Sequence, residues 1–111
     1  MHWCDHLDER ILPRPEPGPV VFAPCNFNSL NKLAHGIADN LALSITAEMI
    51  GYGLPVAIGV SVNAPLWAHP QAKASVAVLR SWGVKVVEPQ EAETGLMMAT
   101  TETVLAALSS P

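Results

Sequence analysis

The chain has 111 residues, of which half are apolar and 14% are charged, and its formal net charge is −4. This composition excludes a disordered chain and predicts one small domain with a packed core. The six Lys and Arg residues are scattered along the chain, so we expect neither nucleic acid nor an anionic membrane surface as a partner.

The first 19 residues differ from the rest in composition, because they hold four of the ten prolines and four of the ten acidic residues. Closely spaced prolines prevent a helix or a central strand. We therefore predict an extended surface segment over 1–19 and a folded domain over 20–111. Charged residues precede any apolar run, which argues against a signal peptide and favours a cytoplasmic chain.

Metal ligands are sparse near this end of the chain. His2, Cys4 and His6 alternate, as ligands on one side of a strand do. A structural zinc site normally needs four preorganised ligands, and the sequence indicates no fourth, so we predict no metal site. Cys4 and Cys25 are expected to be free thiols, as cysteines usually are in cytosolic proteins.

Short apolar runs and helix-capping residues predict the first elements of the domain. Residues 20–23 form an apolar run between prolines and predict a buried strand. Asn28 or Ser29 can cap the helix that follows, and Gly36 is expected to end it. Asp39 can then cap a second helix, which a Gly-Tyr-Gly run stops.

Alternating strands and helices continue to the end of the chain. Residues 55–62 are apolar almost throughout, which is typical of a parallel strand covered on both faces. Proline at a first-turn position predicts a helix after His69, and a third strand is expected over 84–87 before a last helix over 102–108. The order β-α-α-β-α-β-α predicts an α/β fold with a parallel sheet and right-handed crossovers. Doubly wound domains usually have five or six strands, so three strands predict a domain that is incomplete at its N-terminus.

Two polar loops follow neighbouring predicted strands, where open α/β sheets place their ligands. The first, Pro24-Cys25-Asn26-Phe27-Asn28-Ser29, leads into a helix N-terminus that favours a phosphate or carboxylate; a capped turn without a ligand explains it equally well. Asn63 follows the second strand. Its amide can hold a carboxylate, but an Asx-turn is the commoner use of such an asparagine.

Cysteine and histidine in these loops have ordinary structural explanations as well. Cys25 lies beside a helix N-terminus, where the pKa of a thiol tends to fall, yet a small packing residue is the favoured interpretation. His69 is expected to cap a helix or lie on the surface, since no carboxylate partner is evident for a general base. His35 is expected to be a solvated or partly buried helix residue.

At these loops the sequence resembles the homo-oligomeric flavin-containing cysteine decarboxylases. Their first signature is similar to P-A-[ST]-A-N-T followed by I-x-K-x-A-x-G-x-[AS]-D-[ND]-L. The matching positions are Pro24, Asn28, Ser29 (for Thr), Lys32, Ala34, Gly36, Ala38, Asp39, Asn40 and Leu41. The second signature resembles P-x-M-N-x-x-M-W-x-x-P, of which Asn63, Trp67 and Pro70 are kept.

The resemblance implies a Rossmann-like, flavodoxin-type three-layer domain that binds FMN and assembles into homo-oligomers, commonly trimers, acting on a small-molecule substrate. By this resemblance the flavin would be lined by Pro24, Cys25, Asn26, Asn28 and Ser29. Asn63 would hold the substrate carboxylate during catalysis.

The sequence also departs from the family pattern. The first strand and its Gly/Ser phosphate loop have no counterpart before residue 20, the catalytic His has no clear match, and the Cys-bearing A-C-G loop expected between Pro89 and Gly95 is deleted. An FMN-dependent decarboxylase of a cysteine-derived substrate is therefore one expectation. The alternatives are a non-catalytic oligomerising relic without flavin, and a flavoprotein that acts on another acid.

Overall fold

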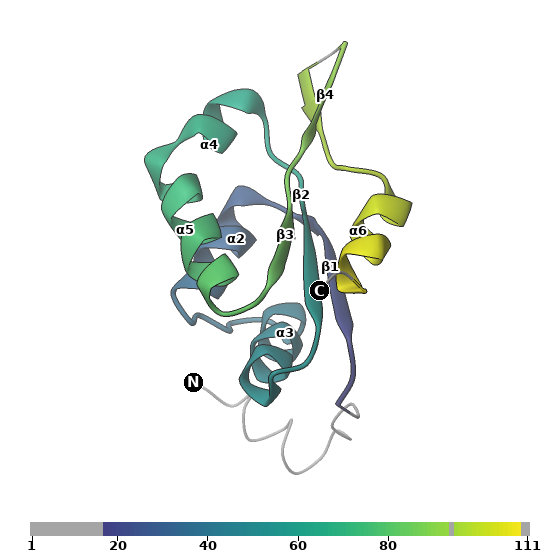
Figure 1. Ribbon diagram of the computed structural model, residues 1–111. Coiled ribbons are helices and arrows are strands. Elements are labelled where there is room, and N and C mark those ends of the chain that lie inside the picture. Colours follow the sequence, from purple (N-terminus) through teal and green to yellow (C-terminus); the bar gives the residue numbers. More distant parts are fainter. Residues whose placement is uncertain (1–16, 94, 110–111) are drawn as a thin grey trace.

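The structure, a computed structural model, describes residues 17–93 and 95–109 (Figure 1). Most of the predicted segment 1–19 lies outside this range. The elements are β1 Val20–Cys25, α2 Phe27–Ala34, α3 Leu41–Tyr52, β2 Val56–Val60, α4 Ala64–Ala68, α5 Pro70–Ser81, β3 Lys85–Val87, β4 Gln90–Ala92, β5 Gly95–Met97 and α6 Thr101–Leu108.

Three parallel strands form the main sheet in the order β1-β2-β3, which confirms the predicted parallel α/β sheet. All five residues of β2 are buried, because β2 is the central strand and helices cover both of its faces. β1 carries one extra residue against β2 between Phe22 and Cys25. A bulge of this kind re-aims the strand end, and the first polar loop starts there.

Helices cover both faces of the sheet, so the domain has three layers, as predicted. Helices α2, α3 and α5 lie on one side of the sheet and α6 lies on the other (Figure 1). The three-helix side buries the larger core, which includes Leu30, Leu43, Met49, Ile58 and Leu79. On the other side, α6 buries Val104 against Ala57 and Ala99.

Two features differ from the predicted elements. The sequence did not indicate the one-turn helix α4 or the antiparallel hairpin β4–β5. Both are very short, and the hairpin strands of three residues each are too brief for a clear alternation of polar and apolar residues. The hairpin occupies the place where the family's cysteine loop was expected.

The predicted helix caps were wrong by one to three residues. Asn26, not Asn28 or Ser29, caps α2, and Asn40, not Asp39, caps α3. α2 begins two residues after β1 ends, so the first amide side chain on the loop reaches the exposed N–H groups. The sequence shows several polar residues at each helix start but not which of them has the extended backbone that a cap requires.

Candidate functional site

The two polar loops lie at the same edge of the sheet, because β1 and β2 are adjacent and parallel. β1 ends at Cys25 and β2 at Val60, and these two residues are paired in register. The backbone N–H of Ser61 donates to the Cys25 carbonyl at 2.9 Å, which extends the pairing into the loops. The structure therefore brings the loop before α2 and the loop before α4 side by side.

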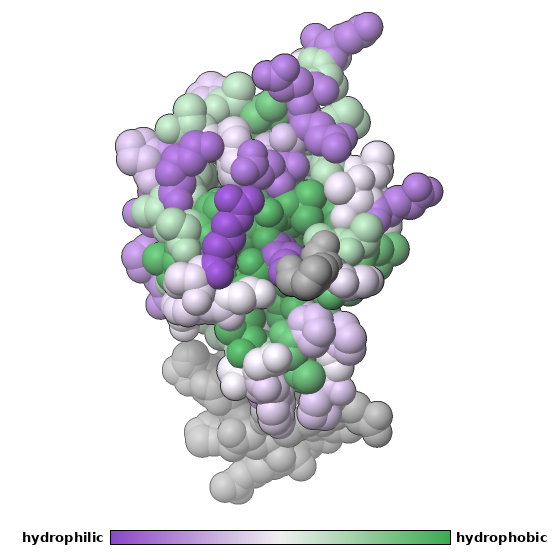
Figure 2. Space-filling view, viewed as in Figure 1, coloured by the Kyte–Doolittle hydropathy of each residue, from purple (hydrophilic) through white to green (hydrophobic). Residues whose placement is uncertain are grey.

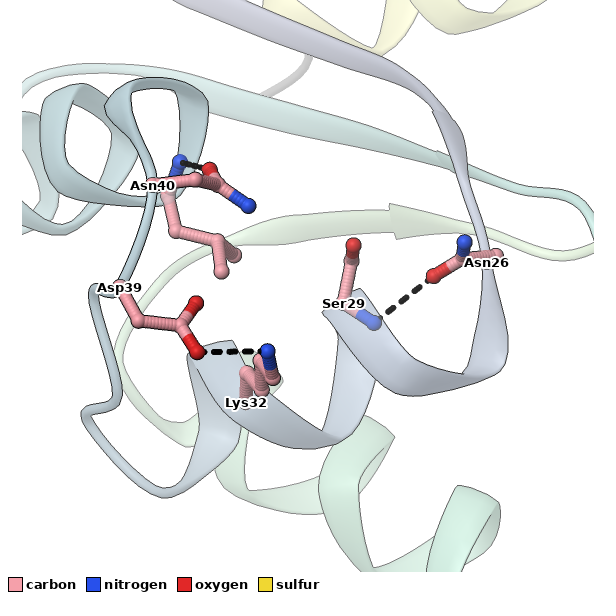
Figure 3. Close-up of polar contacts among 6 residues, drawn as sticks. Asn26, Ser29, Lys32, Asp39 and Asn40 are labelled. Atoms are coloured by element: carbon pink, nitrogen blue, oxygen red, sulfur yellow. Dashed lines mark hydrogen bonds and ion pairs between the residues drawn. The ribbon is translucent and has the colours of Figure 1, made fainter.

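In the first loop, Asn26 fixes the start of α2. Its Oδ1 accepts a hydrogen bond from the Ser29 backbone N–H at 2.8 Å (Figure 3). The oxygen is used in capping, so the donor that this exposed side chain can offer a ligand is its Nδ2 amide. Asn28 is exposed and Ser29 is partly exposed. Both lie in the first turn of α2, between Phe27 and Leu30 in the sequence.

Asn26 also explains one departure from the family signature. It stands at the position where the signature has Ser or Thr. Asparagine, serine and threonine share the ability to cap a helix through a side-chain oxygen. The substitution therefore keeps the local geometry of the loop while replacing a hydroxyl with an amide.

In the second loop, Asn63 has the same arrangement. Its Oδ1 accepts from the Leu66 backbone N–H at 3.0 Å, and the side chain is exposed. The structure thus confirms a local backbone-capping role, although the turn continues as the helix α4 and is not an isolated Asx-turn. The Nδ2 amide of Asn63 is the donor that can face a ligand.

Ring contacts connect the start of α2 with the segment between α4 and α5, and α4 with α5. The rings of Phe27 and His69 meet edge to face with their centroids 5.4 Å apart. His69 caps α5, as predicted, by accepting a hydrogen bond from the Gln71 backbone N–H through Nδ1 at 2.9 Å. Lys73 places its Nζ 3.9 Å from the centre of the Trp67 ring. The sequence showed Phe27 only as a member of the first loop, and nothing local indicated its contact with His69, 42 residues further along the chain.

The Cys25 thiol does not reach the surface of the site. The side chain is fully buried within the larger core. Burial raises the pKa of the Cys25 thiol to about 12, because the thiolate would lose its hydration. The interpretation of Cys25 as a reactive thiol was wrong, and the packing interpretation is confirmed. Cys25 is a free cysteine in the structure, and Cys4 lies outside the described residues.

Several signature residues hold the α2–α3 connection. Lys32 and Asp39 form an ion pair with 2.7 Å between Nζ and Oδ2, and Asn40 accepts from the Leu43 backbone N–H at 2.9 Å (Figure 3). Their contacts are with each other and with the backbone. This part of the signature therefore sets the path from α2 to α3.

Within the described residues, no group of three His, Cys, Asp or Glu side chains is placed to bind a metal; His2, Cys4 and His6 lie outside them. Over the same residues, none of the helices has the length and apolar character needed to cross a bilayer.

Comparison with known proteins shows which family and which structures the chain is similar to. Residues 5–110 match the Flavoprotein family. The chain is 33% identical over 72 residues to the coenzyme A biosynthesis bifunctional protein CoaBC of Bacillus subtilis, which covers 65% of this chain and 17% of that protein. It is 32% identical over 91 residues to a cysteine/cysteine sulfinic acid decarboxylase from an unknown prokaryotic organism, which covers 82% of this chain and 23% of that protein.

Solved structures of similar fold include FMN-dependent enzymes. The FMN-dependent cysteine decarboxylase SpaF superposes with a TM-score of 0.65 at 33% identity, over 81% of this chain and 50% of that chain. HAL3 from Cryptococcus neoformans superposes with a TM-score of 0.69 at 27% identity, over 94% of this chain and 53% of that chain. The chain thus spans about half the length of these structures. With its flavodoxin-like fold and the match over residues 5–110, the chain belongs to the Flavoprotein family.

Proposed function

We propose that this chain forms part of an FMN site and that the loop over 24–29 holds the flavin. The observation that supports this most is the pairing of two capped loops at one edge of the sheet, each with an exposed asparagine. This edge, outside the carboxyl ends of parallel strands, is where open α/β sheets bind ligands. Similar structures include proteins described as FMN-dependent.

The side chains of the first loop suit the chemistry of a flavin. Pro24 offers an apolar surface, and Asn26, Asn28 and Ser29 offer amide and hydroxyl groups for the polar edge of the ring or its phosphate. Cys25 contributes through its backbone alone, because its thiol is buried. The exposed N–H groups of the first turn of α2 add positive potential for an anion. When bound, FMN supplies the redox chemistry.

Asn63 is proposed to orient the substrate. Its oxygen is held by the Leu66 N–H, so the amide group has a fixed direction and its Nδ2 can donate to a carboxylate oxygen. A substrate with a carboxylate beside a thiol would then lie between Asn63 and the flavin loop. This assignment rests on the resemblance to cysteine decarboxylases and on the position of Asn63 at the end of β2.

A non-catalytic flavoprotein relic is the second candidate, and one observation favours it. Residues 90–92 and 95–97 form the hairpin strands β4 and β5 where the family's cysteine loop was expected, and the chain has only Cys4 and Cys25. A small-molecule substrate, a trimer-based homo-oligomer and a cytoplasmic location remain predictions. A flavoprotein that acts on another acid is a variant of the first candidate.

The first test is the visible absorption spectrum after the full chain is mixed with FMN and desalted. Retained flavin bands are expected. Asn28→Ala should weaken FMN binding about 3–10-fold in a fluorescence titration, as the loss of one hydrogen bond does. Ser81→Ala, at the far end of α5, is the control and should leave the affinity unchanged. A colourless protein after desalting would contradict the proposal.

The second test separates catalysis from binding. Release of carbon dioxide from cysteine-derived carboxylates is measured for the flavin-loaded chain and for Asn63→Asp. Aspartate keeps the helix cap but replaces the amide donor with a like charge that repels a carboxylate, so activity should fall at unchanged stability. Flavin bands without any carbon dioxide release would favour the non-catalytic candidate.

A further inference from the structure

Helices α2 and α5 pack side by side and meet through an ordered row of side chains (Figure 1). Phe27, Asn31 and His35 follow one another at intervals of four residues. Residues with this spacing lie on one face of a helix, and this face of α2 lies against the first half of α5. The contacts are Phe27 with His69, Asn31 with Ser75 and His35 with Gln71.

Ser75 is the buried centre of this row. In Figure 2 both hydrophilic and apolar residues show over the side of α4 and α5, so polar side chains are ordinary on the outer surface of α5. Ser75 differs from them because it is only 1% exposed. Its hydroxyl donates to Asn31 Oδ1 at 2.7 Å and accepts from Gln71 Nε2 at 3.1 Å. A buried hydroxyl without partners is costly, so Ser75 favours the one placement of α2 that brings Asn31 to it.

Apolar packing alone specifies the placement of α2 less sharply. The helix has only eight residues and buries Leu30, Leu33 and Ala34. A helix this short is marginal by itself, so its position depends on tertiary contacts. Hydrophobic attraction has no preferred direction, and it tolerates small slides and rotations of one helix on another. A hydrogen bond of 2.7 Å between Ser75 and Asn31 does not tolerate them.

The placement of α2 on α5 sets the distance between the two asparagines of the candidate site. Asn26 caps α2, so it moves with that helix. Asn63 caps α4, and α4 ends at His69, the residue that caps α5. A slide of α2 along α5 would therefore move Asn26 relative to Asn63.

We propose that the hydrogen bond between Asn31 and Ser75 is a positioning contact that holds the flavin loop in place relative to Asn63. Its purpose rests on the proposed function, but the contact itself can be tested without flavin. Asn31 stands at a position that the family signature leaves free, so the resemblance gives it no role. Asn31 and Ser75 act through the helices that carry Asn26 and Asn63.

The test replaces both partners by apolar residues, in the double variant Asn31→Leu with Ser75→Ala. Such a replacement leaves no buried polar atom unpaired, so the thermal unfolding midpoint should stay close to that of the unmodified chain. In the full chain without flavin, the backbone amide NMR signals of residues 26–35 should broaden or double, whereas the unmodified chain gives one sharp set. FMN affinity should fall about 2–30-fold, as expected when packed side chains couple two positions.

Thr46→Val is the matched control. Thr46 is also 1% exposed on the same side of the sheet, but its hydroxyl donates to the Ala42 carbonyl within its own helix, at 2.8 Å. Losing this bond should leave the amide signals of α2 and the FMN affinity unchanged. A double variant that keeps one sharp set of signals for residues 26–35 would overturn the proposal, because the network would then only satisfy buried polar atoms.

A single variant keeps the test decisive if the double variant does not fold. Asn31→Ala removes the partly buried partner, and the Ser75 hydroxyl can then turn to the carbonyl four residues earlier in α5. The same broadening over residues 26–35 is expected, and sharp unchanged signals would again overturn the proposal. Failure of the unmodified chain to bind FMN would contradict the flavin proposal alone, since the NMR comparison is made without flavin.

Discussion

The two faces of the sheet are packed in different ways. On the side of α2, α3 and α5, large side chains fill the core, among them Leu30, Leu43 and Met49. On the side of α6, small residues let the helix approach the sheet closely, and an added Cβ at Gly59 would lie 3.0 Å from Val104 Cγ2. The first face gains stability from large buried side chains. On the second face, close packing of α6 depends on small residues in the sheet.

This difference bears on function because both candidate loops lead into helices of the first face. Asn26 starts α2, and Asn63 starts α4, which leads into α5. The positions of these asparagines therefore depend on the larger core, and α6 can be perturbed with less effect on them.

The largest expected effect is the loss of volume on the three-helix face. Leu43→Ala removes a fully buried side chain of α3 and should lower the free energy of unfolding by about 2–5 kcal/mol. Leu41→Ala, in the same helix but 62% exposed, is the matched control and should change little. Urea unfolding of the two variants gives the comparison. Equal losses would show that the core does not lie where the structure places it.

Added volume should be costly on the α6 face. Gly59→Ala brings a methyl group within 3.0–3.2 Å of Val104, Ala23 and Met98 and should destabilise by about 1–3 kcal/mol through overpacking. Gly51→Ala, within α3 and facing open space, should instead stabilise by up to about 1 kcal/mol, because alanine has the higher helix propensity. A neutral Gly59→Ala would mean that α6 packs loosely.

The buried thiol of Cys25 makes the free energy of unfolding depend on pH. The pKa of Cys25 is raised by burial from 9.0 to about 12, so the unfolded thiol ionises before the folded one. The stability from the neutral thiol is therefore fully present below pH 9.0 and is lost as pH rises toward 12, at up to about 1.4 kcal/mol per pH unit. Unfolding at pH 8 and pH 10, compared between the unmodified chain and Cys25→Ala, isolates this loss, which the variant should lack.

The smallest expected effect is at a helix cap of the same face. Asn40→Ala removes the acceptor for the Leu43 N–H and should cost about 1 kcal/mol. Asn40→Ser retains a capping oxygen and should cost less. Thermal unfolding of both variants distinguishes them, and identical losses would show that the cap is not what Asn40 contributes.

The fold class, the three parallel strands and the two polar loops could be predicted from the sequence. Apolar runs such as 55–62 and turn residues such as Gly36 act locally, so a single sequence displays them. The amides at Asn26 and Asn63 were visible for the same reason, and the family signature followed from residues in order along the chain.

Which residues meet could be learned only from the folded chain. Three features depend on the packing of segments distant in sequence or on strand position. They are the contact of Phe27 with His69, the burial of Cys25 and the hydrogen bond from Arg80 to the Val86 carbonyl of β3. The pKa of Cys25 shows this most plainly. A helix N-terminus lowers the pKa of an exposed thiol, but burial in the larger core raises the pKa of Cys25, because the thiolate would lose its hydration.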